Sequence, residues 1–143
     1  ALFPYEGMDL SIYENVDRIY IMSYERDVQH STYVQSVADV EFFLAQDIPA
    51  EKLFLGIPFY GRQTIYPAKA FTYAEIVAAY APSAEINEVE NIYFNGIQSV
   101  RDKTEYAYQN EIGGIMIWEL AQDTADETSL LKAIDDSIQK GCP

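Results

Sequence analysis

The sequence predicts an α/β fold built on parallel strands, and this prediction rests on three short apolar runs and on the helical patterns between them. The runs cover residues 18–24, 52–59 and 112–118, and apolar residues fill most of their consecutive positions. Consecutive apolar positions are typical of strands covered on both faces, as in parallel sheets flanked by helices. Strands that alternate with helices in this order predict right-handed crossovers within one α/β domain.

The helices between the first strands are marked by capping residues and apolar spacing. We expect the first helix over residues 31–45, with Ser31 as its N-cap. A short second helix should begin at the capping box formed by Thr72 and Glu75, and Pro82 should stop it.

Two further helices are expected in the second half of the chain. One should run from Asn95 to about Gln109, and the last should span roughly residues 127–140, with Gly141 as its stop. Residues 62–91 hold two prolines and several aromatics, so we expect an irregular insertion above the strand ends. The buried stripe of the last helix should comprise Leu130, Leu131, Ile134 and Ile138.

Composition excludes several classes of protein. The chain has 143 residues, 9 Lys and Arg against 23 Asp and Glu, and a formal net charge of −14. Such a charge repels nucleic-acid phosphates and anionic lipid headgroups, and the basic residues are scattered, so we expect neither nucleic-acid nor membrane binding. No apolar run reaches the ~18 residues of a membrane span. At 143 residues with 49% hydrophobic content, residues 1–143 read as a single domain.

Cysteine and histidine are too few for a metal site or an internal disulfide. Cys142 is the only cysteine and His30 the only histidine. A structural metal site commonly needs four such ligands, so we expect neither a metal nor another cofactor.

Candidate functional residues stand at the ends of the three predicted strands. In α/β folds, ligands bind at the carboxyl ends of parallel strands. Flat aromatics with a few polar groups around them suit the apolar faces and hydroxyls of sugars. Two plainer interpretations stay open, namely that Trp118 packs in the core and that Glu25 and Arg62 pair only with each other. The residues at these ends are Met22, Ser23, Tyr24 and Glu25 in the first strand, Pro58, Phe59, Tyr60 and Arg62 in the second, and Trp118 and Glu119 in the third.

Three segments carry a family resemblance at these positions. Residues 16–25 resemble the sixth barrel strand of glycoside hydrolase family 18, the chitinase family. Residues 52–62, which end in Gly-x-Pro-x-Tyr-Gly-Arg, are similar to its seventh strand, and residues 113–123 resemble its eighth strand and the following loop. The three segments occur in family order.

The resemblance implies a partial (β/α)₈ TIM barrel of roughly the last three or four β/α units, with residues 62–91 inserted between strands seven and eight. It also implies substrate-assisted hydrolysis of β-1,4-linked N-acetylglucosamine polymers, in which the substrate's acetamido oxygen attacks the anomeric carbon. The catalytic residues implied are Tyr24, whose hydroxyl would donate to that oxygen, and the adjacent Glu25. The substrate-binding residues implied are Met22, Tyr60, Arg62 and Trp118.

Two departures from the family pattern qualify this expectation. Glu25 stands where the family usually has Asp or Asn, and its longer side chain shifts a hydrogen bond by about 1 Å, which can alter rate. The fourth-strand signature Asp-x-x-Asp-x-Asp-x-Glu, whose last Glu is the general acid, occurs nowhere in the sequence. A whole barrel takes ~250 residues, so we expect a carboxyl-terminal portion that is inactive alone and that starts at the end of a fifth strand near Leu2.

Two alternatives to an enzyme portion stay open. The chain could be a non-hydrolytic, lectin-like relative that binds chitooligosaccharides through its aromatic residues. It could also be only a folding unit, whose open strand edges pair with the missing part of the barrel or with a second copy. The family resemblance further implies secretion.

Overall fold

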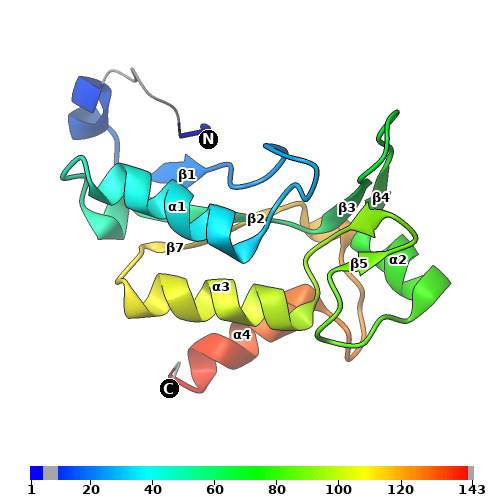
Figure 1. Ribbon diagram of the computed structural model, residues 1–143. Helices are drawn as coiled ribbons and strands as arrows, with labels where there is room; N and C mark the ends of the chain where they lie inside the picture. Colours follow the sequence, from blue (N-terminus) through cyan, green and yellow to red (C-terminus); the bar gives the residue numbers. More distant parts are fainter. Residues whose placement is uncertain (5–9, 142–143) are drawn as a thin grey trace.

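The computed structural model describes residues 1–4 and 10–141, and its centre is a parallel sheet of three strands. β1 (Ile19–Ile21) and β7 (Gly114–Trp118) flank β2 (Leu53–Pro58), and both pair with β2 in parallel (Figure 1). The α/β prediction is therefore confirmed. Leu2 extends the sheet by a parallel bridge to Ile21, on the free side of β1, where the end of a fifth strand was expected.

Helices cover one face of this sheet. Figure 1 shows α1 (Tyr33–Leu44) and α3 (Ile97–Gln109) running along the strands, with α4 (Leu130–Gln139) beside α3. Three short 3₁₀ turns complete the connections, η1 (Leu10–Asn15), η2 (Ala50–Lys52) and η3 (Leu120–Gln122). None of the helices in the described part of the chain has the length and apolar character to cross a bilayer.

The two faces of the parallel sheet differ in burial. One face packs into the core beneath the helices, whereas alternate residues such as Tyr20, Met22 and Met116 are only partly buried on the other. The expectation that both faces are covered is therefore wrong for the described residues, because these strands form an open sheet and not a closed barrel. The strand residues packed against the helical side are Ile19, Ile21, Leu53, Leu55, Ile57, Ile115 and Ile117.

A second, antiparallel sheet lies beyond the carboxyl ends of the parallel strands (Figure 1). Its order is β4-β3-β6-β5, from β3 (Tyr60–Gln63), β4 (Ala70–Thr72), β5 (Glu88–Val89) and β6 (Ile92–Tyr93). Residues 62–91, expected to form an irregular insertion, thus contribute short strands to this sheet. Strands of two to four residues are too short to show a periodicity in the sequence, which explains why they were not predicted.

The capping signals located helix starts to within three residues. α2 (Tyr73–Tyr80) begins at the predicted capping box, in which Thr72 Oγ1 and Glu75 each accept the other's backbone N–H. The N-cap of α1 is Thr32, one residue after the expected Ser31. α3 begins at Ile97, after Gly96 as N-cap and not at Asn95.

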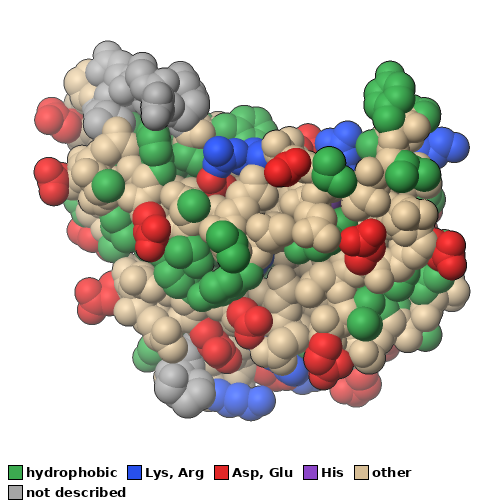
Figure 2. Space-filling view, viewed as in Figure 1, with side chains coloured by type: hydrophobic (Ala, Val, Ile, Leu, Met, Phe, Trp, Pro, Cys, Tyr) green, Lys and Arg blue, Asp and Glu red, His purple; other side chains and the backbone are tan. Residues whose placement is uncertain are grey.

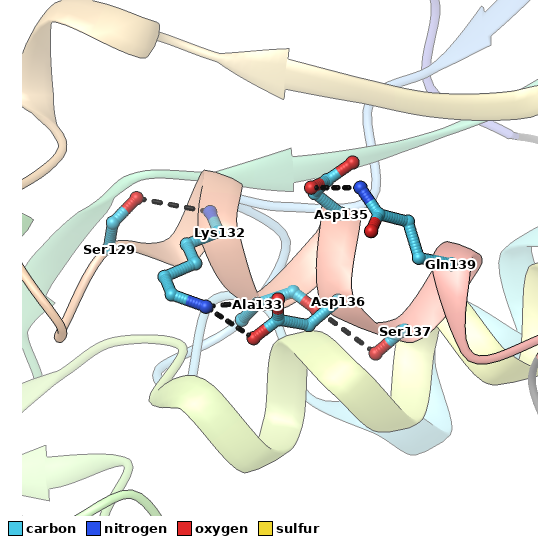
Figure 3. A network of polar contacts seen from close by, with 7 residues as sticks. All are labelled: Ser129, Lys132, Ala133, Asp135, Asp136, Ser137 and Gln139. Carbon is cyan, nitrogen blue, oxygen red and sulfur yellow. Dashed lines mark hydrogen bonds and ion pairs between the residues drawn. The ribbon is translucent and has the colours of Figure 1, made fainter.

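The last helix is shorter and less buried than expected. α4 begins at Leu130, three residues after the predicted start, because Ser129 caps it by accepting the N–H of Lys132. Figure 3 shows this cap and the exposed ion pair in which Lys132 Nζ lies 2.8 Å from Asp136 Oδ2. Leu130 and Ile134 are buried as predicted. Leu131 and Ile138 are 41% and 52% exposed, so the predicted stripe is wrong at these two positions.

Charge is distributed over the outside of the molecule. Figure 2 shows acidic side chains dispersed over the helical face, which agrees with a solvated acidic surface. The β3–β4 hairpin projects above this face and carries hydrophobic side chains at its tip, where Tyr66 is 98% exposed.

Candidate active site

The carboxyl ends of β1, β2 and β7 meet around a concavity of about 550 Å³. Because the strands are parallel, their ends lie at one edge of the sheet, as the sequence predicted. Of the six residues implied to be catalytic or substrate-binding, five line this concavity and the sixth, Arg62, does not. The residues around it are Ala1, Tyr20, Met22, Tyr24, Glu25, Tyr60, Met116, Ile117 and Trp118.

Trp118 presents its indole to this concavity. It is the last residue of β7 and is 54% exposed. Its backbone carbonyl accepts a hydrogen bond from the N–H of Phe59 at 2.7 Å, which fixes the strand end against β2. Core packing, the plainer interpretation of Trp118, is therefore wrong.

Tyr24 lies deeper, on the opposite side of β2 from Trp118. Its side chain is almost wholly buried, and its ring meets that of Tyr60 edge to face at 6.3 Å between centroids. Burial, and secondarily the charge of Glu25, raises the pKa of the Tyr24 hydroxyl above its usual value. The hydroxyl therefore keeps its proton at neutral pH and can donate a hydrogen bond.

Glu25 is held by two side chains from β3. The Tyr60 hydroxyl donates to Glu25 Oε1 at 2.7 Å, and Arg62 Nη1 lies 3.3 Å from the same oxygen. Burial and this bond raise the pKa of Tyr60, so its hydroxyl is a stable donor. The Glu25 backbone has a positive φ of 63°, and its N–H donates to the carbonyl of His30. The ion pair with Arg62 that the sequence left open is thus present.

Arg62 lines a second hollow, of about 350 Å³, on the other side of Glu25. His30 also lines it, and its ring stacks on that of Tyr60 at 5.2 Å. Burial, followed by the positive charges of Lys103 and Arg62, lowers the pKa of His30 to about 4, so its ring is neutral at pH 7. Among residues 1–4 and 10–141, no group of three His, Cys, Asp or Glu could hold a metal ion.

Sequence reasoning missed Tyr20 and Met116. The signal was present, because side chains alternate along extended backbone: Tyr20 of β1 shares a face with Met22, the residue directly after that strand, and Met116 shares one with Trp118 on β7. Gly56 of β2 lies between these rows. A Cβ there would lie 2.3 Å from the Ile21 carbonyl oxygen and 2.9 Å from Met116 Cε, so the absent side chain lets the rows approach.

Asp123 lies in the third of the segments that resemble family 18, and its side chain contacts the start of α4. Its carboxylate accepts the backbone N–H groups of Leu130 and Leu131, each at 2.9 Å, and the Ser129 hydroxyl at 2.8 Å. The carboxylate therefore satisfies hydrogen-bond donors at the amino terminus of α4, and its negative charge is favourable there. Its neighbour Gln122 lines a hollow beside Trp118.

Comparison with protein families identifies the family to which this chain belongs. The model of the glycosyl hydrolases of family 18 matches residues 5–123. The chain belongs to glycosyl hydrolase family 18. The family 18 segments recognised in the sequence thus coincide with the strands whose ends form the concavity.

Solved family 18 structures share this fold. A chitinase from the chitin utilization locus of Flavobacterium johnsoniae is 39% identical, with a TM-score of 0.86 over 95% of this chain and 47% of its own. A chitinase from Rhizomucor miehei is 28% identical, with a TM-score of 0.69 over 90% of this chain and 48% of its own. The chain therefore spans about half the length of these chitinases. The fold expectation of a partial TIM barrel is confirmed.

A plant class V chitinase from Cycas revoluta shares the fold at 22% identity, with a TM-score of 0.74 over 89% of this chain and 48% of that one. That protein was solved in complex with (GlcNAc)₃. The comparison with curated proteins gave no match.

Proposed function

We propose that this family 18 chain supplies the carboxyl-terminal part of a catalytic barrel that hydrolyses β-1,4-linked N-acetylglucosamine polymers. The observation that carries the proposal is that Trp118, at the end of β7, and Tyr24, in the loop after β1, line one concavity at the carboxyl ends of the strands. An exposed indole suits the apolar face of a sugar, and a buried phenol is a directional donor.

Each side chain has a role in the proposed reaction. Trp118 forms the floor under the reacting sugar, and Met22 packs beside it. The Tyr24 hydroxyl donates to the acetamido oxygen, which attacks the anomeric carbon, so the enzyme needs no carboxylate nucleophile. Tyr60 and Arg62 hold Glu25 next to Tyr24, where its negative charge stabilises the positive charge that develops on the acetamido group.

The general acid of the proposed reaction comes from outside this sequence. Protonation of the leaving oxygen contributes typically 10²–10⁴-fold, and the acidic signature that supplies it in the family is not in the chain. We therefore propose that residues 1–143 alone give no turnover and act together with the barrel half that carries that signature.

Complementation tests this proposal. The chain is refolded with a separately produced amino-terminal half of the Flavobacterium johnsoniae chitinase, and release from a chromogenic chitobioside is measured. Activity should appear with the wild-type chain and fall at least 100-fold with Tyr24→Phe, because the donor to the acetamido oxygen is lost. Tyr108→Phe, at an exposed position on α3, is the control and should leave activity unchanged. A pair that assembles into one particle yet gives no turnover would refute the proposal.

A second candidate function is chitooligosaccharide binding without hydrolysis. It is favoured by Glu25, which replaces the usual shorter residue and whose Oε1 is already engaged by Tyr60 and Arg62. In that case the assembled pair would bind chitotriose with measurable heat in a calorimeter but release no chromogen.

A further inference from the structure

Lys103 is a wholly buried lysine that the proposed reaction does not use. It projects from α3, and none of the ion pairs of the described residues includes it. Its Nζ donates to the Ser31 backbone carbonyl at 2.8 Å and to Ser31 Oγ at 2.9 Å. Burying an amine without a carboxylate is costly, so these two hydrogen bonds are the main compensation available to it.

Ser31 connects Lys103 to the backbone just after β1. Its hydroxyl donates to the backbone carbonyl of Ser23 at 2.9 Å, and Ser23 is the residue before Tyr24. The Ser23 hydroxyl in turn donates to Ser36 Oγ on α1 at 3.0 Å. Lys103, Ser31, Ser23 and Ser36 are all buried. A continuous polar chain therefore joins α3 to the backbone that precedes the proposed donor.

The loop of residues 23–31 depends on such contacts because it leaves the sheet after Ile21, the last residue of β1. Within the loop, the Glu25 N–H donates to the His30 carbonyl at 2.7 Å. An ion pair between Arg26 of the loop and Asp39 of α1 ties the loop to that helix. The contact from Lys103 reaches the loop at Ser31, directly after His30, and so supports this loop conformation from α3.

We propose that Lys103 is a positioning residue, which holds the 23–31 loop in this conformation and so presents Tyr24 and Glu25 to the sugar. This inference rests on the proposed function for the role of those two residues. Burial lowers the pKa of Lys103 to about 7, and both its ammonium and its neutral amine can donate the two hydrogen bonds to Ser31. The contact therefore persists on either side of neutral pH.

Replacing Lys103 with methionine tests the inference, because methionine keeps an apolar stem and removes the donors. The matched control is Lys52→Met, because Lys52 Nζ also donates to a backbone carbonyl, that of Tyr13 in η1 at 3.1 Å, but at the opposite end of β2. Two quantities are measured on the full 143-residue chain, the affinity for chitotriose and the amide hydrogen exchange of Glu25 by NMR.

We expect Lys103→Met to weaken chitotriose binding and to speed exchange of the Glu25 amide by about tenfold or more, while Leu55 in the core keeps its protection. Lys52→Met should change neither quantity. Exchange at Glu25 separates positioning from a general loss of stability, because the latter would speed exchange at Leu55 as well.

A folded Lys103→Met chain with wild-type affinity and wild-type Glu25 exchange would overturn the inference. If that variant does not fold, Ser31→Ala takes its place, since it removes the hydroxyl that links Lys103 to the Ser23 carbonyl. Unchanged Glu25 exchange in Ser31→Ala would likewise overturn it. If the wild-type chain alone binds no chitotriose, Glu25 exchange alone decides whether Lys103 holds the loop, and complementation with the other barrel half decides separately whether the proposed function is correct.

Discussion

Tyr60→Phe tests how the candidate site is held together, because it removes one hydroxyl and leaves the ring in place. That hydroxyl donates to Glu25 Oε1 at 2.7 Å, and the ring contacts Tyr24 and His30. After the substitution, Arg62, whose Nη1 lies 3.3 Å from Glu25 Oε1, is the one side-chain partner left to Glu25 among the described residues.

The expected loss of stability follows from the exposure of the acceptor. Hydrogen bonds to charged groups contribute about 1.5–3 kcal/mol when buried. The Glu25 side chain is 40% exposed, so water replaces part of the lost bond and the loss should be about 1 kcal/mol. Tyr73→Phe is the matched control, because the buried Tyr73 hydroxyl donates to the Thr128 carbonyl at 3.0 Å, where both groups are neutral. Its loss should also be about 1 kcal/mol.

Urea unfolding and titration with chitotriose, run on both variants, give the comparison. Both should unfold at similarly reduced urea concentrations, and only Tyr60→Phe should weaken chitotriose binding, because only Tyr60 holds a residue at the concavity. Equal effects of the two variants on binding would refute the reasoning that Tyr60 orients Glu25.

Three further predictions concern the framework of the site. Gly56→Ala should destabilise the chain by about 1–3 kcal/mol in urea unfolding and weaken chitotriose binding, because the new Cβ would lie 2.3 Å from the Ile21 carbonyl oxygen; wild-type stability would contradict the close strand packing. Asp123→Ala should cost about 2 kcal/mol by the same method, since three donors at the start of α4 lose their acceptor, whereas exposed Asp135→Ala should cost under about 0.5 kcal/mol. The pKa of Lys103 is about 7 in the folded chain and 10.5 in the unfolded chain, so the unfolded chain binds more protons between these pH values. The free energy of unfolding should therefore rise by roughly 2 kcal/mol from pH 7.5 to 9. Lys103→Met should abolish this rise, and a rise that persists in the variant would assign it to another group.

The sequence predicted the parallel sheet well, because apolar residues fill consecutive positions of its three strands. It also predicted the shared edge of the sheet, at which Trp118 ends β7 and Tyr24 lies in the loop after β1. The small antiparallel sheet was not predictable, because strands such as Glu88–Val89 are held by pairing between distant segments and not by their own pattern.

Side-chain partners across the site were harder to predict than its location. The ion pair between Glu25 and Arg62 was foreseen as one possibility, whereas the Tyr60 hydroxyl bond and the burial of Lys103 were not. Lys103 lies on a helix whose composition resembles a surface helix, and only the tertiary approach of the 23–31 loop buries it. Local spacing carries no information about such contacts between distant segments.

The central claim is that the ends of β1, β2 and β7 form a sugar-binding concavity with Trp118 as its floor. Trp118 is the only tryptophan in the chain, so its fluorescence reports on this site alone. We predict a saturable change in Trp118 emission as chitotriose is added, weakened by Tyr24→Phe, with no comparable change for cellotriose, which lacks the acetamido groups. Emission that stays constant up to millimolar chitotriose, or that responds equally to cellotriose, would contradict the claim.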